Sequence, residues 1–493
     1  MSAARGVTAL VVGGGVAGAT TALCLARRGL SALVVESSVY DGFRVGDTLP
    51  PIGRVLLTRL GLWERFVAQG HVPSQAIRSA WGSPELAEQH SLFSPFGTGW
   101  HLDRSRFDAM VSTAAEEHGA TVLRGARVTS LDGAGPGPVR ARITGPQGEL
   151  EAEAQVVVDA TGRAAAIARA LGSERLAYDR LVGILGLFTV PPGGPPLGPS
   201  LLLESVPQGW LYSVPLPDGS LLVAAMVDAD AIAPSGLRPL GYWTELLAQS
   251  QHTRARTEGL TPPASLVVRK ASTERLSQIA SIASGAPGAS GTSGLGPAFI
   301  AVGDAASSYD PLSSQGICKA LMTAELAAQA IAEWLQGDAS ALSAYAERIG
   351  AELSRFLSDR AQYYAVERRW PDSLFWRRRL PPEPRDSVVS LDPRARITVG
   401  ARALDPQLVA QLEGALPLGE VERLYALCQT PAPAHELLAR FQQTARLRLP
   451  PRDALTALQG LLRGGALTLA DPPSRARSTD TDLDLHLNRS ATP

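Results

Sequence analysis

Short apolar runs alternate with a helical pattern at the start of the chain. Residues 7–12 form a β-rich apolar run, a helical pattern covers 17–28, and a second apolar run follows over 31–35. The order strand, turn, helix, strand is typical of the opening of a parallel α/β sheet. Further strands of this sheet are expected over 120–123, 139–143 and 155–159.

The pattern changes from residue 181 onward. Four apolar runs, separated by turns rich in Pro and Gly, indicate the antiparallel hairpins of a second sheet. These runs cover 181–190, 200–204, 210–215 and 220–227. A loop rich in Gly, Ala and Ser is expected over 285–297, a strand over 298–302, and helices over 317–334 and 341–369.

This pattern predicts an α/β protein with three folded parts. They are a Rossmann-type dinucleotide-binding domain, a substrate domain built on the antiparallel sheet, and a small, mostly helical C-terminal domain. The predicted division is 1–180 with 265–345, then 181–264, a helical segment and linker over 346–400, the C-terminal domain over 401–470, and a disordered tail over 471–493. The C-terminal domain is expected to be either winged-helix-like or a plain helical cap.

Composition narrows the possible classes. The 46 Lys and Arg residues balance 47 Asp and Glu residues, so the net charge of −1 gives no global field for nucleic acid or an anionic membrane. The three cysteines lie far apart without metal-ligand spacing, so neither a metal site nor a disulfide framework is expected. With no signal-peptide pattern and no apolar run of about 18 residues, we expect a cytoplasmic protein.

A glycine-rich turn follows the first strand. Residues 13–18 fit the pattern G-x-G-x-x-G, and an acidic residue ends the next strand. The first glycine permits a tight turn, the second lets a pyrophosphate approach the backbone, and the third lets helix and strand pack closely. Helix N–H groups stabilise the diphosphate, and the acidic side chain can accept hydrogen bonds from ribose hydroxyls. The residues predicted to bind the dinucleotide are Gly13, Gly15, Val16, Ala17, Gly18 and Glu36.

Two later segments favour FAD over NAD. Residues 159–162, Asp-Ala-Thr-Gly, place a turn of small residues after a strand, where a backbone can lie beside a dinucleotide. Gly303 and Asp304 follow another strand, and the Asp304 carboxylate can accept hydrogen bonds from the ribityl hydroxyls of a flavin. Backbone N–H groups at the next helix start can polarise the flavin's pyrimidine carbonyl. The residues at that helix start are Ser314, Gly316 and Ile317.

Together these motifs resemble those of the glutathione-reductase-type flavoproteins, which include aromatic hydroxylases and flavin-dependent halogenases. The likeness spans about residues 7–330, and segments 44–51, 99–108 and 310–316 are similar to tryptophan-halogenase-like proteins. Within that group the chain most resembles flavoproteins that mature tryptophan-derived quinone cofactors in amine oxidases and dehydrogenases, acting on a tryptophan of a partner protein. The resemblance implies that Arg44 and Arg104 contact FAD. Further residues that carry it are Tyr363, Tyr364, Glu367, Arg368, Trp370 and 375–379.

The resemblance leaves two reactions open. Flavin halogenases carry a Trp-x-Trp-x-Ile-Pro motif and a lysine that receives the hypohalous species. Here residues 210–215 have Tyr212 in place of the second tryptophan, and no lysine precedes Lys270. Because arginine is far less nucleophilic than an amine, hydroxylation of an indole or phenol ring through a flavin C4a-hydroperoxide is favoured over halogenation. A non-catalytic flavoprotein that acts as a binding partner is a third alternative.

Candidate reactive residues and partners follow from this interpretation. Trp210 and Tyr212 could wall the substrate pocket or simply fill the core, and Asp47 could touch the flavin or deliver a proton. O2 is the expected co-substrate, with electrons from a reduced nicotinamide or from a reductase that supplies reduced flavin. A protein or peptide substrate could dock on the C-terminal domain. The run Arg377–Arg379 could meet an acidic partner or be a solvated helix end.

Overall fold

The computed structural model divides the chain into two compact units. The first comprises Met1–Pro384 and Val409–Val421, and the second Arg385–Leu408 and Glu422–Pro493. The loop expected over 285–297, the segment 380–390, most of the helical pattern over 405–415 and the tail over 471–493 lie outside the described residues. The structure describes residues 5–132, 137–236, 238–282, 298–379, 391–400, 403–404, 408–409, 412, 416–444 and 451–470.

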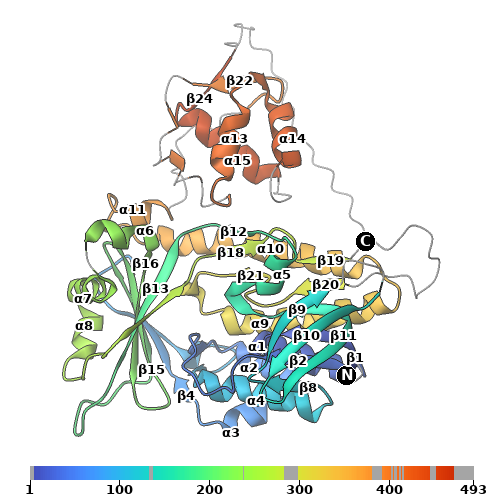
Figure 1. Ribbon diagram of the computed structural model, residues 1–493. Helices are drawn as coiled ribbons and strands as arrows, with labels where there is room; N and C mark the ends of the chain where they lie inside the picture. Colours follow the sequence, from blue (N-terminus) through green and yellow to red (C-terminus); the bar gives the residue numbers. More distant parts are fainter. Residues whose placement is uncertain are drawn as a thin grey trace. The chain divides into compact units, whose positions relative to one another are not determined.

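A mainly parallel sheet forms the centre of the first unit, with strand order β19-β20-β11-β1-β2-β8 (Figure 1). In β1 the Val11 position pairs with Val34 on one side and Val158 on the other, and all three side chains are fully buried. A strand buried on both faces needs such a continuous apolar run, which is why these segments lack polar alternation. The strands are β1 (Arg5–Val12), β2 (Ala32–Glu36), β8 (Thr121–Arg124), β11 (Gly148–Asp159), β19 (Ala280–Ile282) and β20 (Ala298–Ala301).

Helices pack on this sheet and on one another. Helix α1 (Val16–Ala26) contacts both α4 (Arg104–Glu117) and α9 (Gly316–Leu335), and α9 contacts α10 (Ala341–Ala365). Strands β10 (Val139–Gly145) and β9 (Arg127–Asp132) extend β11 as an antiparallel meander. Because β1, β2, β11 and β20 run parallel, their carboxyl ends meet at one edge of the sheet, where α/β proteins bind ligands.

A second, seven-stranded sheet has the order β17-β13-β16-β15-β14-β5-β6. Its central strands are the expected antiparallel hairpins, but β14 pairs with β5 in parallel. The sheet extends beyond the predicted range 181–264, because it also contains strands from residues 76–90 and 266–270. Its strands are β5 (Ala76–Ala80), β6 (Ala87–His90), β13 (Leu181–Phe188), β14 (Leu201–Val206), β15 (Gly209–Pro215), β16 (Leu221–Asp228) and β17 (Leu266–Lys270).

The two faces of the second sheet pack against different partners. On one face α7 (Pro239–Gln249) supplies Tyr242 and Trp243 to an apolar cluster (Figure 1). On the other, Trp210 and Val214 pack in a cluster with residues that follow α9, among them Tyr364 and Trp376. Because successive side chains of a strand point to opposite faces, Trp210 of β15 points to the face that borders the cavity described below.

Short elements complete the first unit. Two three-stranded sheets have the orders β12-β18-β21 and β3-β7-β4. These and the remaining helices are β3 (Thr48–Leu49), α2 (Gly53–Arg59), α3 (Trp63–Ala68), β4 (Val72–Ser74), β7 (Gly99–His101), α5 (Ala166–Ala170), β12 (Arg175–Ala177), α6 (Ala229–Ile232), α8 (His252–Thr257), β18 (Glu274–Leu276), β21 (Ser307–Ser308) and α11 (Leu374–Arg377).

The described part of the second unit combines helices with a small antiparallel sheet of order β23-β22-β24. The first two residues of helix α13 (Glu420–Leu427) are assigned to the first unit, and the rest of the helix belongs to the second unit. The other elements are β22 (Arg396–Val399), β23 (Ala432–Pro433), α14 (Ala434–Thr444), α15 (Pro451–Arg463) and β24 (Leu467–Leu469). Within the described ranges, no helix of either unit is both long and apolar enough to cross a bilayer.

Candidate active site

One cavity of about 1250 Å³ in the first unit gathers most of the predicted site residues. It extends from the carboxyl ends of the parallel strands to one face of the second sheet. Gly18 and Gly303 do not line it. The predicted residues that do are Gly13, Gly15, Val16, Ala17, Glu36, Arg44, Asp47, Arg104, Trp210, Tyr212, Asp304, Ser314, Gly316 and Ile317.

The glycine-rich turn forms a cradle at one end of the cavity. Gly13 has a φ of +102°, and a Cβ there would lie 2.4 Å from the Ala160 carbonyl oxygen. A Cβ on Gly18 would lie 1.9 Å from the Gly13 carbonyl oxygen, so this glycine permits the close packing behind the cavity wall. Gly15, by contrast, has its nearest neighbours 3.8 Å away. A Cβ there would only touch Arg44 and Asp108 at ordinary contact distance, and Gly15 lines the cavity where a pyrophosphate lies in this motif.

Glu36 lies at the end of β2 and organises the turn. Its Oε2 accepts a hydrogen bond of 2.6 Å from the Gly14 N–H, and its Oε1 accepts bonds from the N–H and hydroxyl of Ser38. Burial alone would raise the pKa of Glu36, but these hydrogen bonds and the Arg44 charge outweigh it and lower the pKa. The side chain is therefore ionised at neutral pH, a state in which both oxygens can only accept hydrogen bonds.

Two arginines at the cavity edge share one buried carboxylate. Arg44 Nη1 lies 2.8 Å from Asp108 Oδ2, and Arg104 Nε lies 3.0 Å from Asp108 Oδ1. Arg44 also pairs with Glu36 at 3.0 Å. Sequence reasoning missed Asp108, although its position four residues after Arg104 on a helix is a recognisable ion-pair spacing. The carboxylate fixes both guanidinium groups where they can meet the phosphates of a dinucleotide.

Asp304 projects into the cavity from the loop after β20. Its Oδ1 accepts a hydrogen bond of 2.7 Å from Lys319 Nζ, and its Oδ2 lies 3.5 Å from Arg163 Nε. Burial would raise the pKa of Asp304, but the charges of Lys319 and Arg163 outweigh it and lower the pKa to about 2. Neither cation was given a role from the sequence, although Arg163 directly follows the motif over 159–162 and Lys319 lies two residues after Ile317.

The start of α9 faces the same space. Ser314 adopts a left-handed conformation with φ +51°, which turns the chain into the helix beginning at Gly316. A Cβ on Gly316 would meet no atom within 4 Å, so the helix N-terminus is open toward the cavity. Ser313 Oγ is buried there and has no hydrogen-bond partner among the described residues.

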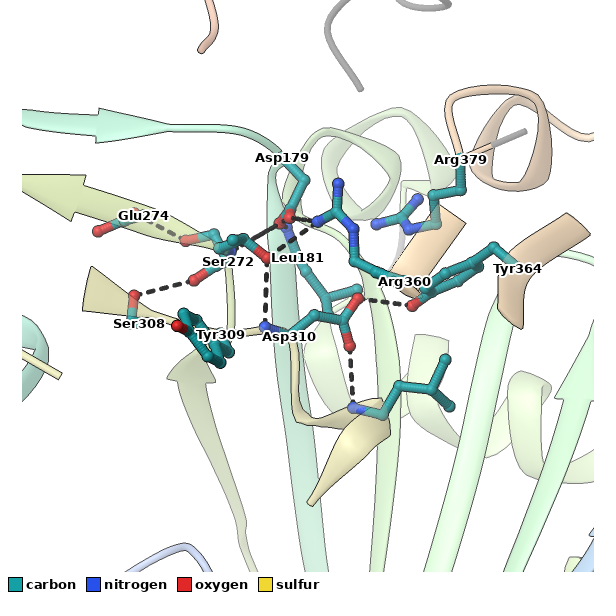
Figure 2. A network of polar contacts seen from close by, with 12 residues as sticks. Asp179, Leu181, Ser272, Glu274, Ser308, Tyr309, Asp310, Arg360, Tyr364 and Arg379 are labelled. Atoms are coloured by element: carbon teal, nitrogen blue, oxygen red, sulfur yellow. Dashed lines mark hydrogen bonds and ion pairs between the residues drawn. The ribbon is translucent and has the colours of Figure 1, made fainter. Parts of the chain in front are cut away.

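Trp210 and Tyr212 form an aromatic wall on β15. Trp210 is only 1% exposed, and its Nε1 donates a hydrogen bond of 2.9 Å to the Tyr364 hydroxyl. The Tyr364 hydroxyl in turn donates to Asp310 Oδ2 at 2.7 Å (Figure 2). Tyr212 donates a long hydrogen bond of 3.3 Å to Asp47 Oδ1. Trp210 therefore lines the cavity and is also part of the core, and its role as a wall of the substrate pocket stays a prediction.

A polar network outside the cavity holds Asp310 in place (Figure 2). The Asp310 N–H donates to Thr273 Oγ1 at 3.2 Å, and Arg360 Nη1 donates to the same oxygen at 2.9 Å. Arg360 also pairs with Asp179. Burial raises the pKa of Asp310. Asp310 lies in a segment recognised from sequence, but its partners come from α10 and from Thr273, between β17 and β18, so the network could not be predicted.

Asp47 is a buried carboxyl at the cavity, and one of its two oxygens lacks a hydrogen bond within the described part of the chain. It is 4% exposed, and its Oδ2 has no hydrogen-bond partner among the residues that the structure describes. Burial raises the pKa of Asp47 above its ordinary value. A carboxyl whose pKa is raised by folding makes its full contribution to stability at low pH, and that contribution is lost as the pH rises through the folded-state pKa.

We therefore expect Asp47→Asn to increase thermal stability at pH 7, because the amide removes the cost of a buried, poorly solvated charge. The difference from the parent protein should shrink toward zero near pH 4, where a carboxyl of ordinary pKa is half protonated. Thermal unfolding at both pH values measures it. The exposed Asp41→Asn serves as the control. A lower unfolding temperature of Asp47→Asn at pH 7 would show that the carboxylate is needed for folding.

The arrangement joins an open glycine cradle, paired arginines, an ionised carboxylate and a helix start around one space that also has an aromatic wall. Such a set fits FAD: Gly15 and Arg44 would hold the adenosine diphosphate half, and Asp304 and Gly316 would hold the flavin half. Within the described ranges no group of three His, Cys, Asp or Glu side chains is placed to hold a metal ion.

Comparison with known proteins agrees with this assignment. Residues 6–195 match the family model for an FAD binding domain. LodB of Marinomonas mediterranea, assigned as an FAD-dependent oxidoreductase, is 28% identical over 75% of this chain and 96% of its own length. Tryptophan 2-halogenase of Chondromyces crocatus is 27% identical over 74% of this chain and 69% of its own length. The solved structure of the myxobacterial chondrochloren halogenase CndH covers 94% of this chain and 100% of its own, with a TM-score of 0.66 and 21% identity.

Fold, cavity and comparisons define an FAD-dependent oxidoreductase. Within that class, the chain is similar to an FAD-dependent oxidoreductase and to a tryptophan halogenase, and its residues 6–195 match an FAD binding domain. The predicted α/β fold, a Rossmann-type FAD-binding domain with an additional antiparallel sheet, is confirmed. FAD as the cofactor is confirmed as well.

Proposed function

We propose that this chain is a monooxygenase that hydroxylates an indole or phenol ring held beside bound FAD. The observation that carries the proposal is the continuity of one cavity from the nucleotide cradle at Gly15 to the aromatic wall at Trp210 and Tyr212. Bound FAD, once reduced, supplies the activation of O2. An electron-rich ring needs little acid–base help in this reaction. The protein must hold the ring and exclude water.

The residues would divide this work. Arg44 and Arg104 bind the phosphates, and Asp304 accepts hydrogen bonds from the ribityl chain. Trp210 and Tyr212 orient the substrate ring and keep water out. Asp47, whose burial raises its pKa, is suited to hold a proton near the Tyr212 hydroxyl.

We propose further that the ring belongs to a tryptophan side chain of a protein or peptide. The cavity volume of about 1250 Å³ exceeds the range of about 300–1000 Å³ typical of small-molecule sites, so there is room for a ring as well as the dinucleotide. The resemblance to flavoproteins that mature quinone cofactors favours a partner protein. The second unit is the proposed docking module, and a reductase or a reduced nicotinamide supplies the electrons.

Isotopically labelled O2 tests the reaction. Protein loaded with FAD is given NADH or NADPH, or a flavin reductase, together with tryptophan-containing peptides and chloride. A product that gains one labelled oxygen atom, in a yield independent of chloride, supports hydroxylation. A chlorinated product overturns it in favour of halogenation. Oxidation of the nicotinamide that no ring substrate stimulates would favour a flavoprotein that acts only by binding.

Halogenation is the second candidate, and one observation favours it. Lys270, one of only two lysines in the chain, lines the cavity from β17. Its side chain is 58% exposed and pairs with Glu274. An amine in the cavity could carry an electrophilic halogen to a substrate ring. If it does, Lys270→Met removes the chlorinated product, whereas a hydroxylated product would still form.

A further inference from the structure

The second lysine of the chain, Lys319, is buried behind the flavin site. It lies in the first turn of α9, and its side chain is only 3% exposed. Its ammonium contacts Asp304 Oδ1 at 2.7 Å and the Ser307 carbonyl oxygen, and it lies 4.2 Å from the centre of the Tyr309 ring. All three contacts lie on the segment that joins β20 to α9. Lys319 therefore ties this segment to the helix whose N-terminus opens on the cavity.

Stability alone does not account for a lysine at this position. Burial lowers the pKa of Lys319 and the Asp304 charge raises it, and the net effect is a lower pKa. The positive charges of Arg163 and Arg175 lie nearby and add to the cost of the ammonium. A buried ion pair is often no more stabilising than apolar residues of similar volume. A lysine at this position is therefore better explained by its effect on the charge and orientation of the Asp304 carboxylate.

Lys319 contacts the Asp304 carboxylate from the side that faces away from the cavity. Asp304 is 34% exposed and lines the cavity, whereas Lys319 does not reach it. The Lys319 ammonium donates a hydrogen bond to Asp304 Oδ1, and Arg163 Nε lies 3.5 Å from Asp304 Oδ2. With Lys319 present the carboxylate is ionised and its rotamer is fixed toward the cavity. Without Lys319 the side chain could turn or take up a proton.

We propose that Lys319 is a positioning residue for FAD, which holds Asp304 as an oriented acceptor for the ribityl hydroxyls. The proposal rests on the role given to Asp304 above. It is independent of whether the enzyme hydroxylates or halogenates its substrate, because it concerns binding of the cofactor alone.

Titration of apoprotein with FAD, followed by flavin fluorescence, tests the proposal. Lys319→Met should raise the Kd for FAD by about 10- to 100-fold, the range expected when a charge-assisted hydrogen bond to the ligand is lost. Asp304→Asn should raise it by a similar factor. The double variant should bind no more weakly than Asp304→Asn alone, because Lys319 acts through Asp304. Arg59→Met is the matched control, since it removes an exposed ion pair to Glu325 on the same helix.

Specific results would overturn the proposal. One is a Lys319→Met protein that unfolds at a lower temperature but binds FAD with the Kd of the parent, which is the result of a purely structural role. Another is a double variant whose loss of affinity is the product of the two single losses. Parent protein that binds no FAD would overturn the proposed function as well.

A second measurement needs no substitution at Lys319. The chain contains only two lysines, so protein labelled with ¹³C at the lysine ε-carbon gives two side-chain NMR signals. The Lys270→Met variant assigns them. Saturation with FAD should shift the Lys319 signal. An unchanged Lys319 signal would overturn the proposal even if Lys319→Met does not fold.

Discussion

Gly18→Ala is expected to lower the affinity for FAD by about two orders of magnitude and to destabilise the first unit by about 3 kcal/mol. A Cβ at this position would lie 1.9 Å from the Gly13 carbonyl oxygen and 2.9 Å from Ala160 Cβ. Neither neighbour is the flexible end of a side chain, so the clash must move α1 away from β1 and the turn. The turn carries the N–H groups that face the pyrophosphate, and its displacement removes them from the ligand.

Gly6→Ala provides the control for this substitution. Gly6 lies in β1, the strand that leads into the turn, and a Cβ there would meet no atom within 4 Å. Alanine at this position should therefore leave both FAD affinity and stability close to those of the parent. Fluorescence titration with FAD and thermal unfolding of the apoprotein separate the two effects. An apoprotein of Gly18→Ala that is destabilised yet binds FAD normally would show that the turn does not form the pyrophosphate site.

The cradle can be predicted from the sequence because its parts are contiguous. Strand, glycine turn and helix follow within residues 7–28, and Gly13 and Gly18 each have a steric reason that lies within the turn and its neighbouring strand. For the aromatic wall, the sequence predicts the two residues, Trp210 and Tyr212, but not the contacts that hold them. Trp210 donates the hydrogen bond that fixes it to the Tyr364 hydroxyl, 154 residues further along the chain. Long-range partners of this kind leave no spacing in the sequence.

The extent of the second sheet shows a similar limit. Strand β5 reads Ala-Ile-Arg-Ser-Ala and β6 reads Ala-Glu-Gln-His, so neither has the apolar alternation that indicates a strand. They join the sheet because β5 pairs in parallel with β14, more than a hundred residues away. Tertiary pairing thus decides their structure where local propensity does not.

The basic run at the end of α11 has an intramolecular explanation. Arg379 Nη2 lies 2.6 Å from Asp228 Oδ1, and Arg378 pairs with both Asp228 and Asp230. Burial would raise the pKa of Asp228, but the Arg379 charge and the hydrogen bonds outweigh it and lower the pKa. Arg378 and Arg379 are therefore neither a solvated helix end nor a surface for an acidic partner. They attach α11 to the end of β16.

Arg379→Met is accordingly expected to destabilise the first unit by about 3 kcal/mol, the lower end of the range for breaking a buried ion pair. The Arg379 side chain is 2% exposed and Asp228 is 3% exposed, so the carboxylate left behind is shielded from water. Arg378 remains within 2.9 Å of Asp228 and limits the loss. The Arg379 guanidinium also lies over the Phe375 ring, with its Cζ 3.7 Å from the ring centre, so methionine removes this cation–π contact together with the ion pair.

Urea unfolding of matched variants separates this effect from the loss of any surface charge. Arg65→Met removes an ion pair to Glu117 whose partners are 43% and 46% exposed, and it should destabilise the protein far less than Arg379→Met. Asp228→Asn combined with Arg379→Met should recover part of the stability lost in Arg379→Met, because the uncompensated charge disappears together with its partner. Equal losses for Arg379→Met and Arg65→Met would mean that the buried pair contributes no more than an exposed one. The attachment of α11 would then have to depend on the apolar contacts of Phe375 and Trp376 instead.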